Sequence, residues 1–171
     1  MFDLIKEDFK VSSKKDWSLF KYLLLCLSSK GVAAVKDYRL SHWFYKKGLY
    51  RIAKMVQNRN LKRHACEISC AADIGPGFAI GHPLGIVIGG GTIIGKNVMI
   101  LSSVVIGSID NEHTGGVHIG ANVYIGTGAK ILGNIQVGNN VKIGANAVVI
   151  TDIPSNSTAV GMPARIINRG E

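Results

Sequence analysis

Aliphatic residues recur every six positions from Glu67 onward, in two parallel series. Members of the second series lie two positions before those of the first, which is typical of a short β-strand, and the Gly or Asn nearby is typical of a turn. This six-residue repeat predicts a β-helix in which three hexads close one triangular coil of about eighteen residues. The first series is Ile74, Ile80, Ile88, Ile94, Ile100, Ile106, Ile119, Ile125, Ile131, Val137, Ile143 and Val149, and the second is Ala72, Phe78, Ile86, Thr92, Val98, Val104, Val117, Val123, Ala129, Ile135, Val141 and Ala147.

The repeat is interrupted twice. Ile80 and Ile88 are eight positions apart, so two extra residues must bulge out near His82. The next interruption is longer and predicts an excursion loop over residues 107–116. Because regular repeats hold themselves together, insertions in them tend to carry function.

The segment before the repeats has the spacing of helices. We expect three of them within residues 1–64, over residues 17–30, 32–47 and 49–64. Asp16 is expected to cap the first helix and Gly31 to end it. The fold class is therefore mainly β: a parallel β-helix domain over residues 67–171, preceded by a short helical segment over residues 1–66.

The net charge of +9 belongs to the helical segment, because residues 1–66 hold 15 Lys/Arg against 5 Asp/Glu, and the other residues hold 5 against 6. A basic helical surface of this kind is most simply solvated, and nucleic acid is not an expected partner. Peripheral membrane contact through the basic helices stays open as an alternative. The aromatic residues of the segment are expected to pack inside it: Trp17, Phe20, Trp43, Phe44 and Tyr45.

Cysteine usage and the first residues favour the cytoplasm, and a location at its membrane face stays open as an alternative. Cys26, Cys66 and Cys70 are too few for a disulfide framework, and acidic residues interrupt any secretory signal at the start of the chain. The most apolar run, residues 19–27, is too short to span a bilayer. Cys66 and Cys70 lack a second pair at metal spacing, so we expect buried thiols and no metal.

Three stretches carry a family resemblance: GHPLGIVIGGGTIIG (81–95), IGTGAKILGNIQVGNNVKIGANAVV (125–149) and AVGMPARII (159–167). They resemble the hexapeptide-repeat acyltransferases and, within them, the serine acetyltransferase family. In style the chain is closest to short O-acetyltransferases of capsule and exopolysaccharide synthesis. The resemblance implies a left-handed coil, acetyl-CoA as acyl donor, and a homotrimer with active sites between subunits.

The resemblance identifies His82 as the catalytic base, because a His before GIVIG holds that role in the family. Glu67, in EISCAA, matches the family's acidic partner, although the family residue is Asp. A neutral imidazole can remove a hydroxyl proton, and a carboxylate can fix its tautomer and stabilise the imidazolium. The hydroxyl would then attack the thioester directly.

Two departures from the family bear on the acceptor. Gly81 stands where serine acetyltransferases have an acidic residue, and Gly115-Gly116 stand where they have an Arg-His pair. We therefore expect a saccharide acceptor, namely a sugar hydroxyl in a surface-polysaccharide precursor. Serine O-acetyltransferase of cysteine biosynthesis stays open as an alternative, as do a xenobiotic acetyltransferase, a non-catalytic scaffold and a metal-dependent hydratase.

The remaining candidate residues also follow from the resemblance. His113 in the excursion loop and His118 are expected to line the acceptor site; together with His82 they are also the three histidines of the zinc alternative. The CoA arm is expected along stacked turns, with an arginine near its phosphates. These cofactor-binding candidates are Gly126, Thr127, Gly144, Ala145 and Arg165.

Overall fold

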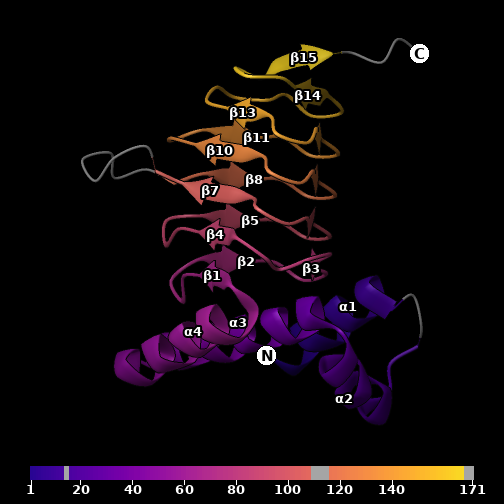
Figure 1. The fold of residues 1–171 in the computed structure, drawn as a ribbon, viewed down its shortest axis with the longest axis vertical. Coiled ribbons are helices and arrows are strands. Elements are labelled where there is room, and N and C mark those ends of the chain that lie inside the picture. Colours follow the sequence, from indigo (N-terminus) through magenta and orange to yellow (C-terminus); the bar gives the residue numbers. More distant parts are fainter. Residues whose placement is uncertain (14–15, 109–115, 168–171) are drawn as a thin grey trace.

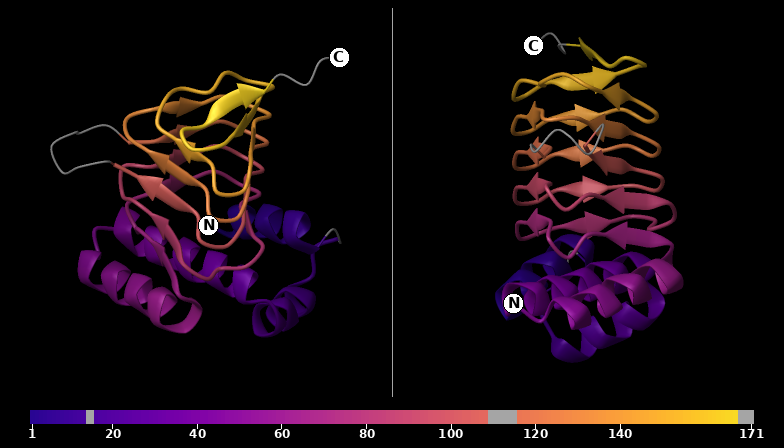
Figure 2. Two further views of the ribbon diagram at one scale, coloured as in Figure 1. Left: turned by 45° about the horizontal axis from the view of Figure 1, so that its top comes forward. Right: turned by 90° about the vertical axis from the view of Figure 1, so that its left-hand side faces the viewer.

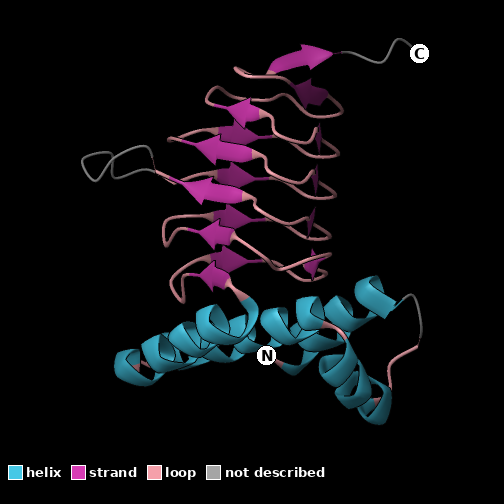
Figure 3. Ribbon diagram, in the orientation of Figure 1, coloured by secondary structure: helices cyan, strands magenta, loops and turns pink. Residues whose placement is uncertain are grey.

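The protein has a layer of helices at one end and a column of short stacked strands above it (Figure 1). The structure is a computed structural model and describes residues 1–13, 16–108 and 116–167. The helices are confined to the base and the strands to the column (Figure 3). The mainly β fold with a helical N-terminal segment, expected from the sequence, is confirmed.

The described part of the base contains four helices, one more than expected: α1 (Phe2–Ser13), α2 (Leu19–Ser28), α3 (Lys30–Lys46) and α4 (Tyr50–His64). Two expected boundaries were wrong. Ser18, and not Asp16, is the N-cap of α2, and Gly31 lies in the first turn of α3. A Cβ at Gly31 would overlap the carbonyl oxygen of Ile80. This glycine therefore allows a helix to touch a strand and does not end a helix.

The strands are two or three residues long and form three sheets, which are the three faces of a triangular coil (Figure 2). All strand pairs are parallel except β14 with β15, which closes the far end of the column. The first sheet contains β1 (Cys66–Ile68), β4 (Ile86–Ile88), β7 (Val105–Gly107), β10 (Lys130–Leu132) and β13 (Val148–Val149). The second contains β2 (Asp73–Ile74), β5 (Ile93–Ile94), β8 (His118–Ile119) and β11 (Gln136–Val137). The third contains β3 (Ala79–Ile80), β6 (Met99–Ile100), β9 (Tyr124–Ile125), β12 (Lys142–Ile143), β14 (Thr158–Val160) and β15 (Arg165–Ile167).

The register between layers shows where the repeat is interrupted. Tyr124 pairs with Lys142, eighteen positions on, which is the length of an undisturbed coil. Cys66 pairs with Ile86, twenty positions on, because the corner near His82 is two residues longer. The extra residues thus leave the strand pairing intact and change only the corner.

The interior of the column is filled by the two aliphatic series. Every residue of both series is buried, with at most 7% of its surface exposed. Neighbouring positions point outward, as the alternating burial of β4 (buried, exposed, buried) illustrates. Stacked coils therefore share one continuous core, which continues into α3 through Ala34, Val35 and Tyr38.

One corner of the column is held by a ladder of asparagines. Asn97, Asn122, Asn140 and Asn156 all have positive φ, between 56° and 62°. Each amide donates to the side-chain oxygen of the next, over 3.1, 3.1 and 2.9 Å. Asn tolerates the left-handed region better than most residues, and its amide can both donate and accept, so it suits a repeated corner.

Side chains of the helices satisfy backbone groups at the open end of the column. The Tyr38 hydroxyl donates to the carbonyl of Ala72 (2.8 Å), and Gln57 accepts from the N–H of Cys70 (3.0 Å). His42 Nδ1 lies 2.9 Å from the carbonyl oxygen of Cys70. No described strand lies below the first coil, so these contacts replace the ladder that another coil would supply.

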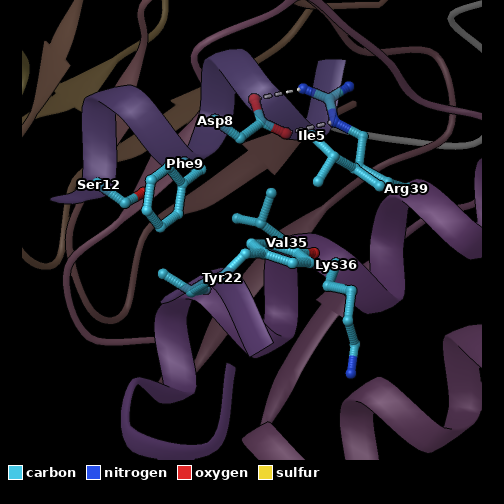
Figure 4. A pocket seen from close by; sticks show the side chains of 9 residues that line it. Ile5, Asp8, Phe9, Ser12, Tyr22, Val35, Lys36 and Arg39 are labelled. Atoms are coloured by element: carbon cyan, nitrogen blue, oxygen red, sulfur yellow. Dashed lines mark hydrogen bonds and ion pairs between the residues drawn. The ribbon is translucent and has the colours of Figure 1, made fainter. Parts of the chain in front are cut away.

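A buried ion pair fixes α1 on this end of the column. Arg39 Nε lies 2.8 Å from Asp8 Oδ2, and Asp8 Oδ1 also accepts from the N–H of Phe78 at 2.9 Å. Arg39 further donates to the carbonyls of Ile74 and Gly75. The pair borders a small cavity of about 10 Å³ between α1, α2 and α3 (Figure 4). Two charges at this depth are stable because each has several partners.

The outer face of α2 remains apolar and exposed. Phe20 is 70% exposed, so the expectation that it packs inside the segment was wrong, whereas Trp17 packs on Phe9 and Tyr22. No helix in the described residues is long and apolar enough to cross a bilayer. The division into domains at residues 66 and 67 stays a prediction.

Candidate functional site

His82 lies on the enlarged corner between β3 and β4. The corner is fixed from both neighbouring layers: the N–H of Gly85 donates to the carbonyl of Ala65 (2.9 Å), and the N–H of Ser103 donates to the carbonyl of Leu84 (2.8 Å). Gly85 has a φ of 70°, which the tight return to β4 requires. Pro83 is buried while His82 is exposed. The insertion therefore presents the imidazole to solvent from a rigid backbone.

A pocket of about 410 Å³ opens beside His82. One wall is the corner itself and the other is the junction between α2 and α3. The two are held together because Gly31 packs directly on the Ile80 carbonyl. The lining residues are Ser28, Ser29, Lys30, Gly31, Gly81, His82, Pro83 and Leu84.

The α2–α3 wall of the pocket is a part of the site that the sequence analysis missed. Residues 28–31 and 81–84 are about fifty positions apart, and no local pattern predicts that they meet. The one available signal was Gly31, a glycine inside a helical pattern, which can indicate close backbone packing. It was interpreted as the end of a helix.

Glu67 is near the corner but does not line the pocket. It lies on β1, half-buried, between the buried Cys66 and Ile68, so its side chain points outward from the sheet. Its partner in register is Val87 of β4, five positions after His82. Among the interactions of the described residues there is no hydrogen bond or ion pair between Glu67 and His82. The expected pairing of these two residues therefore stays a prediction.

The other two histidines expected at the acceptor site are placed differently. His118 is exposed on β8, in register with Ile93 and Gln136, and so belongs to the second sheet, away from the corner of His82. His113 lies outside the described residues. The part of the chain that the structure describes contains no group of three or more His, Cys, Asp or Glu that could hold a metal ion.

The turns expected to bind CoA are stacked. The N–H of Gly126 donates to the carbonyl of Ile143 (2.8 Å), and the N–H of Asn146 donates to the carbonyl of Thr127 (2.8 Å). A Cβ at Gly126 would lie 2.7 Å from the N of Ala145, so only glycine fits there without a shift. Thr127 and Ala145 are exposed on successive layers, with Gly144 half-buried beside them. Arg165 is exposed on β15 at the far end of the column.

Three comparisons with known proteins point to the same family. Residues 116–151 match the family model of the bacterial transferase hexapeptide (six repeats). The chain is 39% identical to a serine acetyltransferase of Buchnera aphidicola over 98% of its length and 62% of the relative's. It is 38% identical to a serine acetyltransferase of Bacillus pumilus, covering 97% of this chain and 77% of the relative. A solved serine acetyltransferase in complex with CoA superposes with a TM-score of 0.85 at 35% identity, covering 96% of this chain and 68% of the other.

The chain spans only 53–64% of the length of the first four curated relatives, all of which are serine acetyltransferases. Their names and near-complete coverage of this chain overturn the expected saccharide acceptor. Of the glycines behind that expectation, Gly115 lies outside the described residues and only Gly116 meets a rigid neighbour. A Cβ at Gly81 would lie 2.6 Å from Leu101 Cδ2, the end of a side chain that can rotate away. A Cβ at Gly116 would overlap the carbonyl of Gly91.

Gly116 therefore has a reason in local packing, whereas the packing around Gly81 would tolerate a larger side chain once Leu101 moved aside. The corner bearing His82, the stacked turns and the helical base all fall within the aligned region, which reaches 98% of the chain. The fold agrees as well: a solved serine acetyltransferase of Brucella abortus superposes with a TM-score of 0.88 at 36% identity, covering 98% of this chain and 68% of the other. The chain belongs to the serine acetyltransferase family of hexapeptide-repeat proteins.

Proposed function

We propose that this protein is a serine O-acetyltransferase, which transfers the acetyl group of acetyl-CoA to the hydroxyl of L-serine. The products are O-acetylserine and free CoA. The observation that carries the proposal is the alignment of nearly the whole chain, His82 corner included, with proteins named serine acetyltransferase. A relative of the same fold has been solved with CoA, which supports CoA as the carrier of the acyl group.

His82 is proposed as the general base. In the described lining of its pocket it is the only side chain that can accept a proton near neutral pH. The neutral imidazole takes the serine hydroxyl proton as the hydroxyl oxygen attacks the thioester carbonyl. When the tetrahedral intermediate collapses, the C–S bond breaks and the imidazolium returns its proton to the departing thiolate. Glu67 is proposed to orient the imidazole, and the family resemblance supports this role.

The stacked turns of Gly126-Thr127 and Gly144-Ala145 are proposed as the path of the pantetheine arm. Thr127 and Ala145 are exposed on successive layers, and their small side chains leave the surface open. Arg165 is proposed near the CoA phosphates, because a guanidinium suits phosphate oxygens. His113 and His118 remain proposed residues of the acceptor site.

A homotrimer with its sites between subunits is proposed as the active form. Single-chain geometry supports this, because His118 and the His82 corner lie on different faces of one column. Neighbouring columns could bring such faces together. A reducing compartment such as the cytoplasm is also proposed, and it is supported by Cys26, Cys66 and Cys70, which are free thiols.

The direct test is release of CoA thiol from acetyl-CoA with L-serine as acceptor. We expect turnover by the wild type, and a fall in kcat of about 10²–10⁴-fold in His82→Ala. Lys54→Ala, on the exposed side of α4, is the matched control and should behave as wild type. Thiol release with a saccharide but not with serine would contradict the proposal, as would full activity in His82→Ala.

A further inference from the structure

Among the described residues that line the pocket beside His82, Lys30 is the one with a permanent charge. The other described lining residues are serines, glycines, a proline, a leucine and His82 itself. L-Serine carries a carboxylate, and a carboxylate that leaves bulk water needs a cation or several hydrogen-bond donors. On the described walls of this pocket, Lys30 is the group that can supply the positive charge.

The backbone that carries Lys30 is held firmly against the catalytic corner. Gly31, the next residue, packs on the carbonyl of Ile80. A Cβ added at Gly31 would also lie 3.5 Å from the carbonyl oxygen of Gly81. Ser29, the residue before, is the N-cap of α3 and accepts a hydrogen bond from the N–H of Val32. The backbone of Lys30, which lines the pocket, is thus held on both sides.

The charge of Lys30 is available to a ligand. None of the ion pairs between described residues involves Lys30, whereas Lys36, on the same helix, lies 3.7 Å from Asp37. No aspartate or glutamate lines the described pocket.

We propose that Lys30 binds the carboxylate of the amino-acid acceptor and so sets the preference for a free amino acid. The inference rests on the proposed function. In serine the carboxylate and the hydroxyl are borne on adjacent carbons, so an ammonium on one wall and an imidazole on the other hold both ends of one small molecule. The anchor acts on acceptor binding, while His82 performs the proton transfer.

The test compares two acceptors and three variants. L-Serinamide keeps the hydroxyl and the ammonium group of serine but replaces the carboxylate with a neutral amide. Lys30→Met removes the charge at similar length, and Lys30→Arg keeps it. Lys21→Met is the matched control, since Lys21 lines a separate hollow between α1 and α2.

We expect Lys30→Met to raise KM for L-serine by about 10- to 100-fold, the worth of a charge-assisted contact. KM for acetyl-CoA, kcat/KM for L-serinamide and the melting temperature should stay at wild-type values. Lys30→Arg should recover most of the loss, and Lys21→Met should match the wild type.

An equal loss on serine and serinamide in Lys30→Met would overturn the anchor and leave the serine acetyltransferase intact. A fall in kcat of Lys30→Met with KM for serine unchanged would also overturn the anchor and leave the serine acetyltransferase intact. Absence of serine turnover in the wild type would instead overturn the proposed function, and the anchor with it.

Discussion

Gly31 of α3 packs against the carbonyl oxygen of Ile80 at the end of β3, so closely that a Cβ would overlap it. This contact joins the helical base to the corner that carries His82. Gly31→Ala must push α3 away from the corner and widen the pocket. We expect a loss of about 1–3 kcal/mol in the free energy of unfolding, as for other overpacked sites, and a lower kcat/KM for the acceptor.

The control for this prediction is Gly107→Ala. Among the described residues, the first atom that a Cβ at Gly107 would meet is the Cα of Gly89, at 4.0 Å. Urea unfolding at one fixed protein concentration measures both variants. If Gly31→Ala is no less stable than Gly107→Ala, the contact between α3 and β3 does not hold the pocket together.

The column was predictable because its signal is local. Each hexad repeats the same inward pair, and both series proved to be buried throughout. The enlarged corner at His82 was also predictable, since an insertion in a regular repeat is visible in the sequence. For the base, only the presence of helices was predictable. How these helices pack was not, because their contact partners lie far away along the chain. Asp8 accepts from the N–H of Phe78, seventy positions on, and no periodicity indicates such a pair.

The same limit bears on the wrong acceptor prediction. Gly116 was interpreted as the loss of a ligand contact, whereas the backbone of Gly91 leaves no room for a side chain there. A missing side chain has two explanations, absence of a ligand contact or absence of space. Only the structure distinguishes them, because the atom that fills the space comes from another coil.

The buried pair of Asp8 and Arg39 gives a second prediction. Both side chains are at most 7% exposed, and burial raises the pKa of Asp8 although Arg39 opposes it. Asp8→Ala leaves a buried guanidinium without its partner and should cost about 3–5 kcal/mol in the free energy of unfolding. Arg39→Met should cost a similar amount. The double variant should cost clearly less than the two together, because it leaves no unpaired charge.

Urea unfolding of the four proteins completes this double-mutant cycle. Glu7 and Lys10 provide the matched control, since they also lie 2.8 Å apart on α1 but are half exposed. Glu7→Ala should change stability by less than about 1 kcal/mol. Additive costs for Asp8→Ala and Arg39→Met would show that the pair is not the unit that fixes α1.

The asparagine ladder gives a third prediction, which separates backbone strain from hydrogen bonding. Asn140 has a φ of 57°, donates to Asn156 and accepts from Asn122. Asn140→Gly loses the side-chain hydrogen bonds but still adopts the positive φ without strain. Asn140→Ala loses the same hydrogen bonds and also strains the backbone. We expect Asn140→Ala to be less stable than Asn140→Gly by about 1 kcal/mol in thermal or urea unfolding. Equal stability of the two variants would mean that the left-handed corner costs alanine nothing here.

His64 gives a prediction on pH. Burial is the main cause that lowers its pKa, Arg63, Lys36 and Lys30 add to it, and Asp37 at 3.9 Å opposes it. The pKa of a histidine in the unfolded chain is about 6.5. When the pKa is lower in the folded state, the unfolded chain binds the proton more readily, so the stability present above this pKa is lost as the pH falls. Thermal unfolding between pH 7.5 and about pH 5 should therefore show the wild type losing its advantage over His64→Gln below about pH 6.5. Parallel curves for His64→Gln and the wild type would show that the buried imidazole does not destabilise the base in acid.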